Sequence, residues 1–126
     1  MASIELFSLP ADVPPALSGK TSVAVDVLRA GTTIITALGN GAAAIVPCVD
    51  IETTRSRASE NDKALLGGER HGLLIEGFSL SNSPETYEPD VVQGRTIFFT
   101  TTNGTRAIEA CRSADRASTR CRYSST

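Results

Sequence analysis

The stretch that decides the fold class is Val23-Ala24-Val25-Asp26-Val27-Leu28, which is apolar except for one carboxylate near its end. Such a run, rich in β-branched residues, is typical of a strand buried within a parallel sheet. The next segment begins with Thr32-Thr33, places its apolar residues on one helical face and ends at Asn40-Gly41, a common helix stop. The sequence therefore predicts a buried strand followed by a helix.

The same alternation continues outward from this unit. Further strands are expected at residues 43–49 and 96–100, and residues 4–6 form a shorter candidate. Helices are expected at residues 51–64 after the N-cap Asp50, from Ser83-Pro84 to about residue 92, and around residues 105–110. Strands and helices in alternation indicate an α/β fold, with a layered, mostly parallel sheet and flanking helices.

Length and composition limit the function classes. The 126 residues predict one domain, and 40% hydrophobic with 21% charged residues is ordinary globular composition. No apolar run is long enough for a membrane helix, and the N-terminus has no basic flank typical of a signal peptide. We therefore expect a cytoplasmic protein without a membrane partner. Three cysteines without CxxC spacing argue against a disulfide framework or a zinc site.

Charge is distributed unevenly along the chain. Residues 112–126 carry four arginines and one acid, Asp115, while residues 1–111 hold 8 basic and 13 acidic residues, a net charge of −5. An acidic body is a poor surface for nucleic acid, so we expect no nucleic-acid partner. Residues 113–126 contain no Val, Ile, Leu, Phe or Met. The sequence therefore predicts an α/β domain over residues 1–111 and a disordered tail over residues 112–126.

Three polar segments follow predicted strands, where open α/β sheets bind ligands. In the first, Asp26 has the chemistry to hold a hard cation and Arg29 to bind a phosphate or sulfonate, with Thr32 and Thr33 at a helix N-terminus that favours an anion. A structural alternative stays open, in which Asp26 pairs with Arg29 and Thr32 only caps the helix. Leu28 stands where a DxD phosphatase motif requires a second aspartate.

The second segment, residues 100–106, places four hydroxyls, an amide and a glycine between a strand and a helix. It lacks the P-loop pattern and is a candidate anion cradle, or else a capped turn. The third runs from residue 67 to residue 84, where Glu69 and Glu76 would join Asp26 in a Mg²⁺ site, unless Glu69 and Arg70 form only a surface pair. The single histidine, His71, excludes a histidine-rich metal site.

The chain resembles the 2-phosphosulfolactate phosphatase family in four blocks, which occur in the family's order and at close to its spacing. The blocks are VDVLRAGTT (25–33), GGER (67–70), IEGF with SNSP (75–78 and 81–84), and TTTNGTR (100–106). The resemblance runs from about residue 4 to residue 115. Family members are roughly twice as long, so the resemblance implies an incomplete sheet and a C-terminus unlike the family. In that case the strand at 96–100 would be an exposed edge carrying Phe98 and Phe99.

The resemblance implies a Mg²⁺-dependent phosphatase that hydrolyses (2R)-2-phospho-3-sulfolactate to 3-sulfolactate and phosphate. In methanogens this step belongs to coenzyme M biosynthesis, and bacterial members serve other sulfonate metabolism. The implied catalytic residues are Asp26, Arg29, Glu69 and Glu76, with Asp26 and Glu69 at the metal. The implied substrate-binding residues are Thr32, Thr33, Arg70, Asn82, Ser83, Thr101, Thr102, Asn103, Gly104 and Thr105. The partner prediction leaves open whether the chain forms a homo-oligomer. The alternative function is that of a truncated, inactive family member that at most binds small anions.

Overall fold

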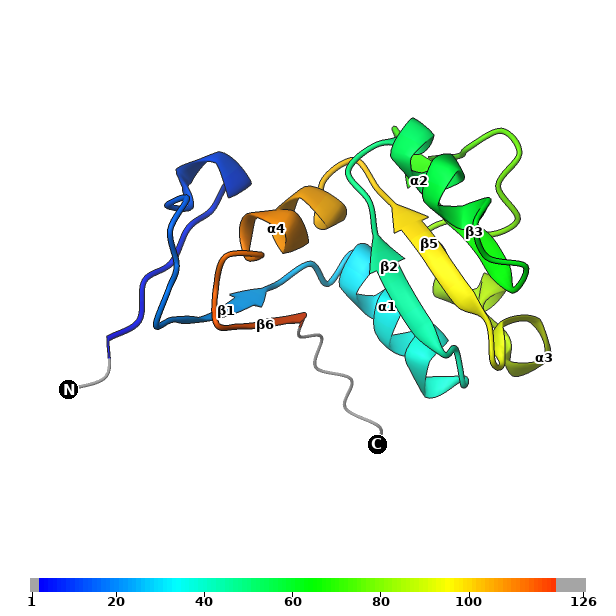
Figure 1. The fold of residues 1–126 in the computed structure, drawn as a ribbon, viewed down its shortest axis with the longest axis horizontal. Coiled ribbons are helices and arrows are strands. Elements are labelled where there is room, and N and C mark those ends of the chain that lie inside the picture. The colour runs from blue at the N-terminus through cyan, green and yellow to red at the C-terminus, as the bar shows by residue number, and fades with distance from the viewer. Residues whose placement is uncertain (1–2, 120–126) are drawn as a thin grey trace.

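The computed structural model describes residues 3–119, and it is an α/β fold as the sequence predicts (Figure 1). The strands are β1 (Thr21–Ala24), β2 (Ala44–Pro47), β3 (Ala64–Arg70), β4 (Leu73–Leu74), β5 (Thr96–Thr100) and β6 (Arg116–Thr119). The helices are α1 (Ala30–Gly39), α2 (Ile51–Ala58), α3 (Pro89–Val92) and α4 (Gly104–Ala110). Two 3-10 turns, η1 (Pro10–Asp12) and η2 (Pro84–Thr86), complete the described elements.

The described strands form two sheets. The larger has the order β2-β5-β3-β4, in which β2, β5 and β3 are parallel and β4 pairs antiparallel with β3. The smaller is the parallel pair of β1 and β6, which lies beside α4 and apart from the larger sheet (Figure 1). Parallel neighbours need crossover connections, which α2 and the segment containing α3 supply to the larger sheet.

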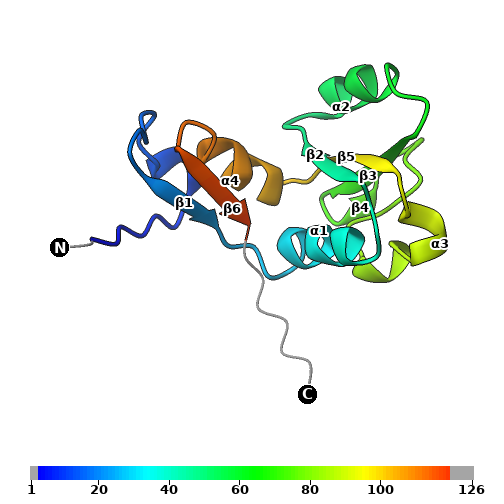
Figure 2. The same cartoon turned by 60° about the horizontal axis from the view of Figure 1, so that its bottom comes forward.

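Helices cover both faces of the larger sheet, with α1 on one side and α2 on the other (Figure 2). Because side chains alternate along a strand, β5 sends Ile97 and Phe99 into the core beneath α1, and Phe98 into a second core with Cys48 and Ala58 of the α2 side. All three β5 side chains are buried. The expectation of an exposed edge at residues 96–100 is therefore wrong, since β5 is flanked by both β2 and β3.

The small sheet departs most from the sequence prediction. The run 23–28 contributes only its first residues to β1, and Val23, Val25 and Val27 are exposed rather than buried. A disordered tail is also wrong for Arg116–Thr119, which forms β6 in register with β1 from Thr21↔Arg116 to Ala24↔Thr119. Strand pairing uses backbone groups, so β6 needs no apolar side chain to form. The rest of the predicted tail, residues 120–126, lies outside the described residues.

Other boundaries follow from local chemistry. The N-cap at Asp50 is confirmed, because its side chain accepts a hydrogen bond from Thr53 N at 2.7 Å, although α2 ends at Ala58 rather than residue 64. The helix expected from residue 84 to residue 92 is split into η2 and α3, since Glu88 precedes a proline and is extended. Residues 4–6 form no strand.

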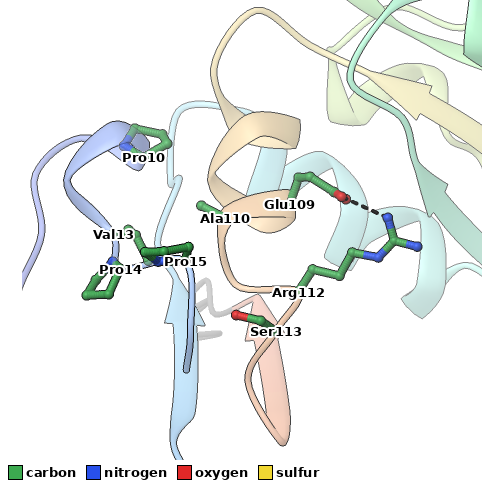
Figure 3. Close-up of a pocket in the computed structure, with 8 residues that line it drawn as sticks. All are labelled: Pro10, Val13, Pro14, Pro15, Glu109, Ala110, Arg112 and Ser113. Atoms are coloured by element: carbon green, nitrogen blue, oxygen red, sulfur yellow. Dashed lines mark hydrogen bonds and ion pairs between the residues drawn. The ribbon is translucent and has the colours of Figure 1, made fainter. Parts of the chain in front are cut away.

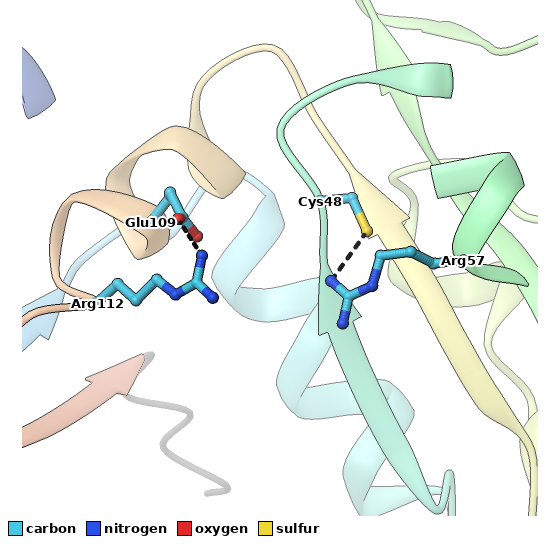
Figure 4. Close-up of polar contacts among 4 residues, drawn as sticks. All are labelled: Cys48, Arg57, Glu109 and Arg112. Atoms are coloured by element: carbon cyan, nitrogen blue, oxygen red, sulfur yellow. Dashed lines mark hydrogen bonds and ion pairs between the residues drawn. The ribbon is translucent and has the colours of Figure 1, made fainter. Parts of the chain in front are cut away.

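Figure 4 shows two side-chain pairs, one at the end of α4 and one between α2 and the residue that follows β2. Arg112 Nη1 donates to Glu109 Oε1 at 2.9 Å at the end of α4, where both side chains are exposed. Arg57 Nη1 lies 3.9 Å from Cys48 Sγ, which is buried under α2. Cys48, which directly follows β2, therefore fills the α2-side core. Across residues 3–119, no helix is long and apolar enough to cross a membrane.

Candidate active site

The three predicted ligand segments meet at the carboxyl ends of their strands. β3 and β5 are parallel neighbours, so the segments that follow Arg70 and Thr100 lie at one edge of the larger sheet. Asp26, which follows β1, reaches the same place: a Cβ added to Gly104 would lie 2.7 Å from Asp26 Oδ2 and would clash with Ala30 Cβ. Only glycine allows this contact between the β1–α1 loop and the start of α4.

Glu69 connects the β3–β4 hairpin to the segment after β5. Its carboxylate accepts hydrogen bonds from Thr102 N at 2.6 Å, from Gly72 N at 2.7 Å and from Thr102 Oγ1 at 3.0 Å. Burial acts to raise the pKa of Glu69, but these hydrogen bonds outweigh it and hold the pKa below its ordinary value. Glu69 is therefore an ionised, buried side chain whose two oxygens are already engaged.

Arg70 is also engaged within the protein. Its guanidinium donates to the carbonyls of Glu69 and Val49, and to Thr100 Oγ1 at 2.7 Å. The surface pair of the Glu69 and Arg70 side chains is not formed, because Arg70 meets the backbone oxygen of Glu69 and not its carboxylate. The structure thus places Arg70 where it holds β2, β3 and β5 together at their carboxyl ends.

The turn before α4 is closed by its own threonines. Thr105 N donates to Thr101 Oγ1 at 3.1 Å, while Thr105 Oγ1 accepts from Thr101 N and donates to the Thr101 carbonyl. Both side chains are buried. Together with Thr102, whose hydroxyl bonds Glu69, they form the capped turn that the sequence left open as an alternative. Asn103 is exposed, and its side chain makes no cap hydrogen bond.

The loop before α1 faces the segment 81–85. Arg29 Nη1 donates to Ser83 Oγ at 3.3 Å, and Ser83 Oγ in turn donates to Glu85 Oε1 at 3.2 Å. Thr32 Oγ1 donates to the Val27 carbonyl at 2.6 Å. The alternative pairing of Asp26 with Arg29 is not formed among the described residues. Two buried oxygens have no hydrogen-bond partner among these residues, Thr33 Oγ1 and Asn82 Oδ1, and both belong to predicted substrate-binding residues.

Glu76 does not join the other carboxylates. It is exposed in the turn after β4, where its backbone carbonyl accepts a hydrogen bond from Arg55 Nη2 at 2.6 Å. Within residues 3–119 no three His, Cys, Asp or Glu side chains are grouped so that they could hold a metal ion. The expected cluster of Asp26, Glu69 and Glu76 is therefore wrong, because the hairpin carries Glu76 away from the strand ends.

Two cavities lie beside this edge rather than within it. One, of about 320 Å³, lies between the N-terminal segment and α4 and is shown in Figure 3. Its lining residues are Pro10, Val13, Pro14, Pro15, Glu109, Ala110, Arg112 and Ser113. The other, of about 640 Å³, runs along α1 from Thr32 to Asn40 and is lined on its other side by Pro84, Glu85 and Glu88. Neither is lined by Asp26 or Glu69.

Sequence reasoning missed how closely β3 approaches β5. A Cβ added to Gly68, whose φ is +136°, would overlap the Thr100 carbonyl, and one added to Gly67 would lie 2.6 Å from the Tyr87 hydroxyl. The signal was present as two adjacent glycines at the end of an apolar strand, a pattern that marks close backbone approach. This contact lets Glu69 reach the backbone of Thr102.

Fold and site together define an α/β protein whose candidate site is built from strand-end loops, with one carboxylate, Asp26, left without a side-chain partner among the described residues. The sequence profile of the 2-phosphosulpholactate phosphatase family matches residues 7–123, and the chain belongs to that family. The match extends into the segment that the sequence analysis set apart as unlike the family.

Three relatives, each named a probable 2-phosphosulfolactate phosphatase, give the extent of the similarity. The chain is 50% identical to that of Clostridium acetobutylicum over 99 residues, which are 78% of this chain and 42% of the relative. It is 51% identical to that of Symbiobacterium thermophilum over 109 residues, 83% of this chain and 47% of the relative. It is 46% identical to that of Synechococcus sp. strain CC9605 over 111 residues, 86% of this chain and 46% of the relative. The chain thus spans less than half the length of these relatives.

Proposed function

We propose that the chain belongs to a Mg²⁺-dependent phosphatase that hydrolyses (2R)-2-phospho-3-sulfolactate to 3-sulfolactate and phosphate. The observation that carries the proposal is the contact of Asp26 with Gly104. It joins two of the four family blocks in space, although they lie far apart in the sequence. The family match and the names of the relatives support the same reaction.

The donor set fits Mg²⁺ in its usual protein form, with one or two carboxylates, water and substrate phosphate oxygens. Asp26 is the carboxylate available for this role, since it is half-buried and its side chain has no hydrogen-bond or ion-pair partner within the described part of the chain. Glu69 contributes less directly, because both of its oxygens already accept hydrogen bonds. When bound, Mg²⁺ would neutralise charge on the phosphate.

In this proposal two exposed side chains, Arg29 and Asn103, bind the anionic groups of the substrate. Among residues 3–119 the exposed Arg29 guanidinium donates one hydrogen bond, to Ser83, and its other N–H groups have the geometry to bind a sulfonate or carboxylate. Asn103, whose side chain is exposed, directly precedes Gly104, the residue that Asp26 approaches. The turn before α4 is stabilised by the hydrogen bonds of Thr101, Thr102 and Thr105. The proposal assigns no catalytic role to Glu76.

The test is phosphate release from 2-phosphosulfolactate by the purified chain, with Mg²⁺ and with a chelator. We expect Mg²⁺-dependent release that Asp26→Asn lowers by about 100-fold or more, as for loss of a group that stabilises the transition state. Asp90→Asn, which changes an exposed carboxylate in α3, is the matched control and should leave the rate unchanged. No release above the chelator control would refute the proposed activity for this chain.

A binding measurement separates this outcome from the alternative of an inactive anion-binding protein. In that case 3-sulfolactate would bind to the chain without any phosphate release from the phosphorylated substrate. Arg29→Ala should then weaken binding, because it removes the exposed guanidinium at the candidate site. Catalysis in sulfonate metabolism or coenzyme M biosynthesis remains part of the proposal and depends on the first result.

A further inference from the structure

One side of α1 forms a wall of the larger cavity, the one of about 640 Å³. The residues of this wall recur with the period of an α-helix and therefore lie on one side of it. They are Thr32, Ile35, Thr36, Gly39 and Asn40. Other residues of α1, among them Thr33, Ile34 and Ala37, are buried. Gly39 is exposed, and a Cβ added to it would meet no atom within 4 Å, so the α1 wall is open to a ligand.

The opposite wall of the cavity is acidic. It consists of Pro84, Glu85 and Glu88, and both glutamates are exposed. Among residues 3–119, no side chain that carries positive charge lines the cavity. Glu85 accepts a hydrogen bond from Ser83 Oγ, and Glu88 has no ion-pair partner within the same residues. A complementary ligand therefore carries positive charge opposite the glutamates and apolar groups opposite Ile35.

The segment that follows β6 has this chemistry. Residues 120–126 have the sequence RCRYSST, with two basic residues and no acid. In an extended chain successive side chains point to opposite sides. Arg120 and Arg122 would then share one side, and Cys121 and Tyr123 the other. A segment bound in this form directs its arginines to the acidic wall and its cysteine and tyrosine to α1.

The same segment is long enough to reach the cavity. Thr119 pairs with Ala24 in the small sheet. Gly31 N, in the first turn of α1, donates to the Asp26 carbonyl at 2.8 Å. The end of β6 therefore lies near the start of α1 (Figure 2). Residues 120–126 in extended form span about 23–25 Å, whereas the part of α1 that lines the cavity is about 12 Å long.

We propose that residues 120–126 bind in the cavity along α1, with their arginines against Glu85 and Glu88. The charge of the segment, the alternation of its side chains and its attachment near α1 favour this occupant. The volume of the cavity is typical of a small-ligand site, so it holds a few side chains of the segment. The inference does not rest on the proposed reaction. It does affect the candidate site, because an arginine at Glu85 competes with Ser83, the partner of Arg29.

The test is disulfide formation in the full chain with Gly39→Cys, which places a thiol in the α1 wall within reach of the native Cys121. The matched control is Leu38→Cys, at a neighbouring position that is 46% exposed but does not line the cavity. Under mild oxidation in dilute solution, the disulfide from position 39 to Cys121 should form about 10-fold faster than that from position 38, because binding raises the effective concentration at one position only. Peptide mapping by mass spectrometry assigns each disulfide, and Cys48 and Cys111 are buried.

A charge reversal tests the role of the arginines. Arg120→Glu combined with Arg122→Glu, in the chain that carries the thiol at position 39, should slow the disulfide to the control rate. Adding Glu85→Lys and Glu88→Lys to that variant should restore the faster rate, because the complementary charges are then exchanged.

Three results would overturn the proposal. The first is equal rates at positions 38 and 39, and the second is a rate at position 39 that the charge reversal leaves unchanged. The third is disulfides that join two chains and disappear on dilution, which would assign the cavity to the segment of a second copy.

Discussion

Replacing Glu69 by alanine removes the acceptor of three hydrogen bonds that join the β3–β4 hairpin to the segment after β5. A hydrogen bond to a charged group contributes about 1.5–3 kcal/mol, and an unsatisfied buried donor costs about 1–3 kcal/mol. Gly72 is exposed, so water replaces its lost partner, whereas Thr102 N is held closer to the core. We therefore expect Glu69→Ala to lower the free energy of unfolding by about 2–4 kcal/mol, a large share of a total of about 5–15 kcal/mol.

Urea unfolding measures this loss, and hydrogen exchange locates it. Glu69→Gln keeps the shape and one acceptor oxygen, so it should cost less than the alanine variant. Glu60→Ala, at an exposed position after α2, is the control and should stay within about 0.5 kcal/mol of the unmodified chain. If Glu69→Ala matches that control, or if the amides of Thr102 and Gly72 exchange at unchanged rates, the stabilising role argued for Glu69 is incorrect.

Three further predictions concern the same edge of the sheet. Hydrogen bonds hold the pKa of Glu69 below its ordinary value, so the stability that the carboxylate contributes is complete at neutral pH and is lost as the pH falls through that lowered pKa. The free energy of unfolding, measured from pH 7 to pH 3, should therefore fall less steeply with pH for Glu69→Gln than for the unmodified chain. Gly104→Ala should destabilise the fold by about 1–3 kcal/mol through its clash with Ala30, and should also lower any Mg²⁺-dependent phosphate release because the added methyl group displaces Asp26; equal activity at full stability would contradict the close approach. Gly68→Ala should fail to give folded protein in a circular-dichroism melt. Gly72→Ala, at a glycine whose φ is also positive (+78°) but which has open space around it, should cost only about 1 kcal/mol; similar melting temperatures would contradict the backbone contact at Gly68.

The central sheet was predictable because its signals are local. The apolar run at 96–100, the cap at Asp50 and the helix stop at Asn40-Gly41 each depend on residues close in sequence, and the structure confirms all three. The apolar run at 23–28 predicted a buried strand. Its composition could not show whether other parts of the chain cover that strand, and the structure leaves Val23, Val25 and Val27 exposed.

Long-range polar contacts could not be read from the sequence. Glu69 follows a strand and is a carboxylate, so a metal role was a reasonable hypothesis, but its partner Thr102 lies 33 residues away. Which donor reaches the Glu69 carboxylate depends on the register of β3 and β5, and on Gly67 and Gly68 of β3, which allow the close approach. β6 was missed for a related reason, since its pairing with β1 uses backbone groups and leaves no periodic pattern in the side chains.

The pairing of β1 with β6 sets the order of events during synthesis. Thr21 pairs with Arg116, so the whole larger sheet is translated between the two strands of the smaller one. At a translation rate of about 5–20 residues per second, β6 is synthesised roughly 5–20 s after β1. During that time Val23 and the valines of the loop after β1 are available to chaperones and to neighbouring nascent chains. In contrast, β3 is followed by its neighbour β5 within a few seconds. The earliest strand of the chain is thus the last to find a partner.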